Sequence, residues 1–112
     1  MALIIGSTAL HELFPDKVRS PKDFDYFGRE TVLPVGIAPA DTKIEPFWHD
    51  SFEGTQLDRN GFATLDELYT IKVSHAYWEL KNGSWDKHMC DILMMQDLGA
   101  KLDMDLHKLL YS

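Results

Sequence analysis

The sequence has a single cysteine, no long hydrophobic run and fewer basic residues than acidic ones. Cys90 alone excludes an intramolecular disulfide and a zinc site built from several cysteines. No stretch approaches the roughly 18 apolar residues of a membrane span, and no basic segment precedes the short apolar opening. We therefore expect a cytoplasmic protein without a membrane partner. Eleven Lys and Arg against 18 Asp and Glu give a net charge of -7, which disfavours sequence-independent binding of nucleic acid.

The apolar residues that are present suffice for one packed core. Hydrophobic residues make up 45% of the chain and aromatic residues 12%, which is typical of a globular rather than a disordered protein. The length of 112 residues fits one domain over 1–112. Strand-like patterns come first and helix-like patterns second. This order predicts an α+β fold with a small mixed β-sheet packed by helices.

Three strands are expected in the first half of the chain. The apolar segment 2–5 predicts a buried strand, after which Ser7 or Thr8 would cap a short helix over 9–14. The alternation of acidic and aromatic residues over 23–27 predicts a second strand. A third is expected over Lys43–Trp48, where a proline favours an edge position or a bulge. We expect a loop or an edge strand over 28–41 and a loop over 50–61.

Three helices are expected in the second half. Thr64 and Glu67 form the pattern of a capping box, which opens a helix that runs to about residue 81. A second helix is expected to start at Ser84 or Asp86 and to end at Gly99. A last short helix is expected over 104–111, and helices near 64–81 and 85–98 would pack on the sheet.

Asp23 and Asp25 are the first candidates for chemistry. Carboxylates two positions apart on a strand share one face at a spacing of about 6 to 7 Å, and a divalent cation can bridge them. Gly6 permits close approach of the backbone, and Ser7 would lie where the amides of a helix N-terminus could hold a phosphate. The alternative is that both aspartates belong to the solvated face of an edge strand.

Gly6-Ser7 followed by Asp23-Phe24-Asp25 resembles the core signature of the DNA polymerase beta-like nucleotidyltransferase superfamily. The resemblance implies that the Gly-Ser turn holds a nucleoside triphosphate and that the two aspartates bind Mg²⁺ or Mn²⁺. The approach to the aspartates, which begins at Arg19, is similar to that of the abortive-infection toxin branch. Arg19 is accordingly expected at the nucleotide.

Two later segments, 66–72 and 86–92, resemble further motifs of the toxin branch and of small nucleotidyltransferase-like proteins of tailed phages. The resemblance implies that Lys72 supplies positive charge to the triphosphate, while Asp91 orients Lys87 or His88. We expect Lys72, His88 and Asp91 to meet between two antiparallel helices and to face the strand of Asp23 and Asp25.

Active members of the superfamily carry a third carboxylate, which acts as general base on the attacking hydroxyl. Glu45 is the candidate here, with Asp41 and Asp50 as alternatives. The implied reaction transfers a nucleoside monophosphate from a nucleoside triphosphate to a hydroxyl of RNA, protein or a small molecule. Its setting would be a bacterial or phage-infected cell, where the protein could belong to a toxin–antitoxin pair.

The alternative function is a catalytically silent protein of a phage or mobile element. Such a protein would bind a nucleotide without turnover or block a host protein, with an acidic surface that imitates nucleic acid. The net charge of -7 is compatible with that hypothesis. Nucleotide affinity without transfer would favour it.

Overall fold

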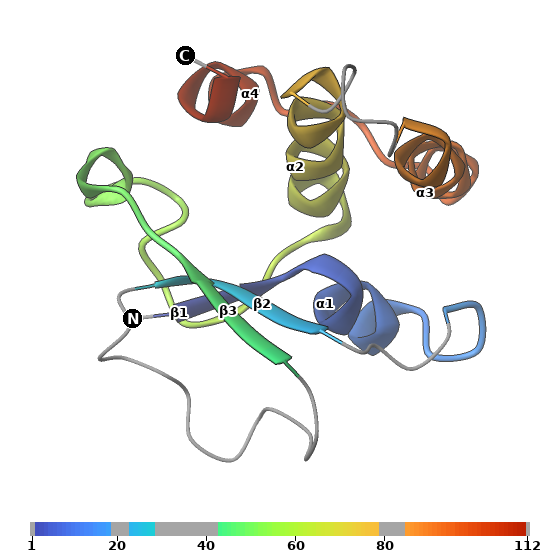
Figure 1. Cartoon of the computed structure of the whole chain (residues 1–112), viewed down its shortest axis with the longest axis horizontal. Coiled ribbons are helices and arrows are strands. Elements are labelled where there is room, and N and C mark those ends of the chain that lie inside the picture. The colour runs from blue at the N-terminus through green and yellow to red at the C-terminus, as the bar shows by residue number, and fades with distance from the viewer. Residues whose placement is uncertain (1, 19–22, 29–42, 79–84, 112) are drawn as a thin grey trace. The chain divides into compact units, whose positions relative to one another are not determined.

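The structure, a computed structural model, describes residues 2–18, 23–28, 43–78 and 85–111 (Figure 1). At some of these positions, among them Asp23, Glu45, Lys87 and His88, the backbone element alone is described. Strands and helices are both present, and the expected α+β class is confirmed. The chain separates into two compact units, Met1–Ala63 and Thr64–Ser112.

The first unit contains a four-stranded mixed sheet with the strand order β3-β2-β1-β4 (Figure 1). The antiparallel pair β1 (Ala2–Ile5) and β2 (Asp23–Gly28) forms its centre. A parallel neighbour flanks each of them: β3 (Lys43–Phe47) lies beside β2, and β4 (Gly61–Phe62) lies beside β1. The expected mixed sheet is confirmed, and Pro46 does lie in an edge strand. The alternative that placed Asp23 and Asp25 on an edge strand is wrong, because β2 has a partner on both sides.

Helix α1 (Gly6–Leu13) follows β1 without a connecting loop. Ile5 takes the N-cap position in extended conformation and makes no side-chain capping bond, so the expected cap on Ser7 or Thr8 is wrong. Gly6 makes the direct junction possible, because its φ of +68° is a conformation that residues with a Cβ rarely adopt. The buried residues Thr8, Ala9 and Leu10 lie in this helix, which packs on β1 and β2.

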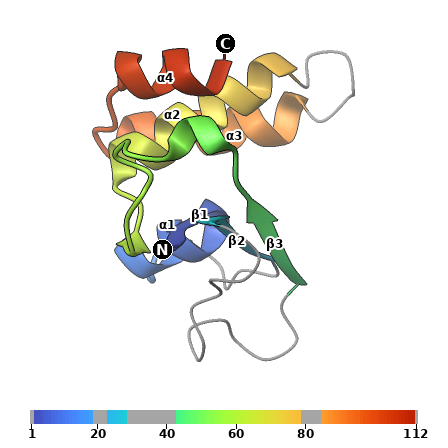
Figure 2. The ribbon, with the colours of Figure 1, turned by 90° about the vertical axis from the view of Figure 1, so that its left-hand side faces the viewer.

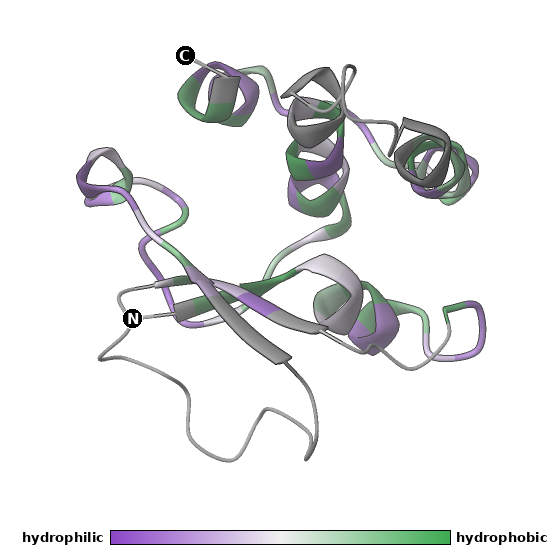
Figure 3. Ribbon diagram, viewed as in Figure 1, coloured by the Kyte–Doolittle hydropathy of each residue, from purple (hydrophilic) through white to green (hydrophobic). Residues whose placement is uncertain are grey.

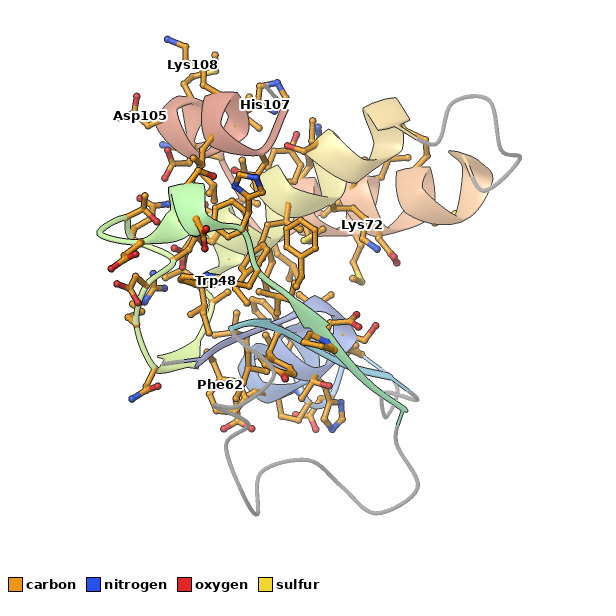
Figure 4. The ribbon with its side chains drawn as sticks, turned by 60° about the vertical axis from the view of Figure 1, so that its left-hand side comes forward. Trp48, Phe62, Lys72, Asp105, His107 and Lys108 are labelled. Atoms are coloured by element: carbon orange, nitrogen blue, oxygen red, sulfur yellow. The ribbon has the colours of Figure 1, made fainter. Side chains whose placement is uncertain are left out.

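Aromatic side chains complete the core of the first unit. Tyr26 and Phe27, adjacent on β2 and therefore on opposite faces, are both almost fully buried. The Phe27 ring centroid lies 5.3 Å from that of Phe47 and 5.4 Å from that of Phe52. Trp48 packs edge-on against Phe52 at 5.8 Å (Figure 4). This geometry is the one that aromatic pairs prefer, so the segment after β3 is fixed to the sheet.

The segment 50–61 is more ordered than the loop that the sequence predicts. It begins with a short 3₁₀ helix, η2 (Asp50–Phe52), and ends in β4. His49 caps η2, since its Nδ1 accepts a hydrogen bond from the amide of Ser51 at 3.2 Å. Burial of Phe52 orders η2, and a two-residue strand such as β4 carries too little pattern to be recognised from the sequence. Of the segment 28–41, all but Gly28 lies outside the described residues.

The second unit consists of α2 (Leu65–Trp78), α3 (Trp85–Asp97) and α4 (Met104–Tyr111), with α2 packed against both others (Figure 2). The capping box is confirmed: the Thr64 amide donates to Glu67 Oε1 at 2.8 Å, and the Glu67 amide donates to Thr64 Oγ1 at 3.2 Å. Gly99, with a φ of +93°, ends α3 as expected. The amide of Ala100 donates to the Met95 carbonyl at 3.0 Å, as in a Schellman motif.

Polar side chains on α2 hold the segment that leads into α4. Asp66 Oδ1 accepts from the Lys101 amide and Thr70 Oγ1 accepts from the Asp103 amide, both at 2.9 Å. One turn further, Ser74 Oγ lies 3.0 Å from His107 Nδ1. Because positions 66, 70 and 74 are spaced by four, they lie along one side of the helix. This side carries hydrogen-bonding side chains although Thr70 and Ser74 are buried. Figure 3 shows hydrophilic and hydrophobic stretches that alternate along α2.

The remaining core of the second unit is apolar and comes from all three helices: Leu68, Ile71, Ile92, Met95 and Leu106. The expected boundaries of α4 are confirmed. Residues 79–84, which include the expected end of α2 and the turn before α3, lie outside the described part of the chain. The packing of these helices on the sheet, and a single domain over 1–112, stay predictions.

Candidate functional site

The junction between β1 and α1 lies directly against a carboxylate of β2. In the antiparallel register Asp25 pairs with Ile5, the residue that precedes Gly6. A Cβ added at Gly6 would lie 2.9 Å from Asp25 Oδ2, closer than real Cβ contacts come. Position 6 therefore favours glycine for its positive φ, and a Cβ there would also have to displace the Asp25 carboxylate.

The Asp25 carboxylate is thus placed at the N-terminal end of α1. Helix N-termini carry a partial positive charge, and a nearby anion stabilises them by about 0.3–1 kcal/mol. Helix α1 has no acidic residue in its first turn and no side-chain cap on Ile5. A residue of the neighbouring strand, half-buried Asp25, supplies the negative charge instead. The sequence spacing alone did not indicate this role for Asp25.

The backbone register also places two other expected carboxylate positions near Asp25. Glu45 of β3 pairs with Asp25 in the parallel register, and Asp23 lies two positions earlier on β2. Register partners and positions two apart share one face of a sheet. Carboxylate oxygens are the ligands that Mg²⁺ and Mn²⁺ prefer, so the residue types at these positions fit such an ion. Among the described side chains, no group of three or more His, Cys, Asp or Glu could hold a metal.

Ser7 lies in the first turn of α1 and is exposed. Its backbone amide is one of the first four of the helix, which have no carbonyl partner within the helix itself. Such amides bind phosphates at the start of helices in other proteins. The position expected of Ser7 thus agrees with the fold, whereas Arg19 lies outside the described residues.

In the second unit, Lys72 of α2 and Asp91 of α3 form an ion pair (Figure 4 labels Lys72). Lys72 Nζ lies 3.2 Å from Asp91 Oδ2, and the two side chains are 26% and 37% exposed. Gln96 Nε2 donates to the Tyr69 hydroxyl at 2.8 Å. Residue 72 thus meets 91 and residue 69 meets 96, so α2 and α3 run antiparallel, as expected.

The ion pair gives Asp91 a partner that the resemblance does not name. The resemblance has Asp91 orient Lys87 or His88, whereas the structure pairs Asp91 with Lys72. Lys87 and His88 lie in α3, four and three positions before Asp91, and so on its side of the helix. That Lys72, His88 and Asp91 face the strand of Asp23 and Asp25 stays a prediction.

Sequence reasoning gave no role to Thr70, Ser74 or His107. Their hydrogen bonds fasten α4 to α2, and His107 lies on α4 while Asp105 and Lys108 point outward from it (Figure 4). The signal in the sequence is the spacing of four between Asp66, Thr70 and Ser74 in a helix whose other residues are mostly apolar. A polar row of this kind at buried positions indicates a hydrogen-bonded helix contact.

Comparison with known protein families finds a match within the second unit. Residues 67–112 match the model of a domain of unknown function, DUF7275, which thus covers α2 from its first turn through α4. No curated protein and no solved structure matches the chain. In the described part of the chain no helix is long and apolar enough to cross a membrane.

Proposed function

We propose that the protein is a metal-dependent nucleotidyltransferase whose catalytic residues lie in the first unit. The observation that carries the proposal is the contact between the Gly6 turn and the Asp25 carboxylate on a central strand. A helix N-terminus for phosphates and a carboxylate for the metal then lie side by side, as transfer from a nucleoside triphosphate requires.

Each candidate site residue of the first unit has a distinct role in this proposal. Gly6 allows β1 to join α1 directly, and the first amides of α1, with Ser7, bind the phosphates. Asp23 and Asp25 hold Mg²⁺, which when bound neutralises phosphate charge and stabilises the attacking and leaving oxygens. Glu45, in register with Asp25, takes the proton of the acceptor hydroxyl.

The chemical change is a substitution at the α-phosphorus. The acceptor oxygen forms a bond to this phosphorus, the bond to the bridging oxygen breaks, and pyrophosphate leaves. The hydroxyl proton passes to the carboxylate of Glu45. The protein forms no covalent intermediate, so the rate depends on positioning and on stabilisation of charge.

Arg19 supplies positive charge to the nucleotide in this proposal. That Lys72, Lys87 and His88 also bind the nucleotide stays a prediction from the resemblance. Asp91 holds Lys72 in place, as their 3.2 Å ion pair suggests. A bacterial RNA or protein is the proposed source of the acceptor hydroxyl.

Incubation of the full chain with Mg²⁺, a bacterial lysate and each nucleoside triphosphate, labelled at the α- or the γ-phosphate, tests the proposal. We expect label in RNA or protein from the α-labelled nucleotide only, because pyrophosphate carries the γ-phosphate away. Asp25→Asn should abolish the transfer, and Glu45→Gln should slow it about 100-fold or more with nucleotide binding retained.

Glu12→Gln is the matched control, because it removes one exposed carboxylate from α1 at the end away from Gly6. It should transfer label like the wild type. Transfer that survives Asp25→Asn would overturn the proposal. Nucleotide binding without any transfer would favour the silent binding protein instead.

A further inference from the structure

Two phenylalanine rings of the sheet are exposed at its edges. Phe47 of β3 is 40% exposed and Phe62 of β4 is 36% exposed, and these strands are the two ends of the order β3-β2-β1-β4. On the central strand β2, Tyr26 and Phe27 are only 2% and 1% exposed. A flat ligand that covers an exposed ring removes apolar surface from water, so such a ring can take part in binding.

Phe47 lies on the face of the sheet that carries Asp25. Phe27 follows Asp25 by two positions on β2 and therefore shares its face, and Phe47 is the register partner of Phe27 on β3. One strand spacing across the sheet and two residues along it separate Phe47 from Asp25, which puts their Cα atoms about 8 Å apart. The exposed ring is thus near the candidate metal-binding carboxylate.

Two buried aromatic neighbours hold the Phe47 ring. Its centroid lies 5.3 Å from that of Phe27, with 56° between the ring planes, and 5.6 Å from that of Phe52, with 39° between the planes. Neither neighbour is more than 3% exposed. Because the ring is already packed in the free protein, a ligand that stacks on it loses little affinity to the ordering of this side chain.

The start of α1 and Phe47 lie on opposite sides of Asp25 along β2. Ile5 pairs with Asp25 in the antiparallel register, so the step from Ile5 to Gly6 leads away from Phe27. Phe47, the register partner of Phe27, lies in the other direction. A nucleoside triphosphate has the same linear order, with the phosphates at one end, the ribose in the middle and the base at the other end.

We propose that Phe47 stacks on the base of the nucleoside triphosphate and that this base is a purine. The inference rests on the proposed function, which places the phosphates at the start of α1 and the metal at Asp25. The base then extends toward Phe47. A base carries no charge, so the neighbouring carboxylates do not repel it. Purines are preferred because two fused rings cover more of the phenylalanine ring than a pyrimidine does.

Calorimetric titration of the full chain in Mg²⁺ with ATP, GTP, CTP, UTP and inorganic tripolyphosphate tests the inference. Tripolyphosphate carries the phosphates without a base. We expect the wild type to bind ATP and GTP about tenfold more tightly than tripolyphosphate, and more tightly than CTP and UTP. Phe47→Leu keeps an apolar side chain but removes the ring. It should lose this tenfold gain and bind tripolyphosphate like the wild type.

Phe62→Leu is the matched control, because Phe62 has nearly the same exposure on the opposite face of the sheet (Figure 4 labels Phe62). Phe62 pairs with Ile4, and Ile4 pairs with Tyr26, which is adjacent to Phe27 and so lies on the other face. This variant should bind all five ligands like the wild type. Phe47→Tyr retains the aromatic ring and should keep the preference for purines.

A measurement on the wild type covers the case that Phe47→Leu does not fold. Nuclear Overhauser effects should connect the base protons of bound ATP with the ring protons of Phe47. Bound ATP without these effects would overturn the inference and leave the proposed function standing. Equal affinities for ATP and tripolyphosphate, a preference for pyrimidines, an equal loss in Phe62→Leu or a loss in Phe47→Tyr would do the same. If the wild type binds neither tripolyphosphate nor any nucleoside triphosphate, the proposed function fails and the inference fails with it.

Discussion

Carboxylates of the two units stand in different kinds of surroundings. In the helical unit Asp66 accepts the amide of Lys101, and Asp91 pairs with Lys72, so both fasten one segment to another. In the sheet unit Asp25 lies against Gly6 at the start of α1, where the absence of a side chain leaves room for the carboxylate. Acidic residues that look alike in the sequence thus fasten helical segments in one unit and lie against a helix start in the other.

The largest expected effect concerns the aromatic packing that anchors η2 to the sheet. Phe52→Ala should lower the free energy of unfolding by about 4 kcal/mol, because Phe52 is 3% exposed and packs against four aromatic rings. Phe47→Ala is the matched control: Phe47 is 40% exposed, so its loss should be smaller. Urea unfolding checks both, and equal losses would contradict the central place of Phe52.

Gly6→Ala should lower the free energy of unfolding by about 3 kcal/mol. The new Cβ meets both an unfavourable positive φ and Asp25 Oδ2 at 2.9 Å. Gly54→Ala isolates the first cause, since Gly54 has a φ of +76° with no atom within 4 Å of its Cβ position. The expected loss there is about 1–2 kcal/mol.

The double variant Gly6→Ala with Asp25→Ala completes this comparison. Removal of the carboxylate should restore part of the stability lost at Gly6, because the clash disappears while the strained φ remains. Strictly additive losses in urea unfolding would show that the close approach of Asp25 has no energetic consequence.

Thr70→Val should destabilise the helical unit by about 2 kcal/mol. The substitution keeps the shape but removes the hydroxyl that donates to the Asp66 carbonyl and accepts from the Asp103 amide. Hydrogen exchange should show faster exchange of the Asp103 amide and of α4. Unchanged exchange in α4 would mean that the polar row on α2 does not hold this helix.

The smallest expected effect is that of the ion pair. Lys72→Met should change the free energy of unfolding by no more than about 0.5 kcal/mol, because both partners are partly exposed and water screens them. The effect should vanish at high salt. A loss several times larger would show that Lys72 has a structural role beyond the pair, which would weaken its assignment to nucleotide binding.

Local signals explain which elements the sequence could predict. Both capping-box residues lie within four positions of each other, and Gly99 marks the end of α3 by itself, so these ends were predictable. The start of α1 was not predictable, because no pattern in residues 2–8 indicates that an isoleucine in extended conformation takes the N-cap position. Strand β4 was missed for a related reason: only its pairing with β1 defines it.

The candidate site was predictable as a set of residues but not as a geometry. The Gly-Ser and Asp-x-Asp pattern named Gly6 and Asp25, which the structure brings together. The register that puts Asp25 opposite Ile5 depends on how the sheet pairs, and pairing involves residues about twenty positions apart. The partner of Asp91 likewise depends on helix packing, which the spacing within α3 does not contain.

The pairing of β4 with β1 has a consequence for the order in which the chain folds. Leu3 pairs with Gly61, and the Ala63 amide donates to the Ile4 carbonyl at 2.9 Å. The last residues of the first unit therefore pair with its first strand, β1. Closing so long a loop is slow, whereas helices form from neighbouring residues. The helical unit should therefore acquire protected amides early in refolding, and the amide of Ala63 should be among the last of the described residues to do so.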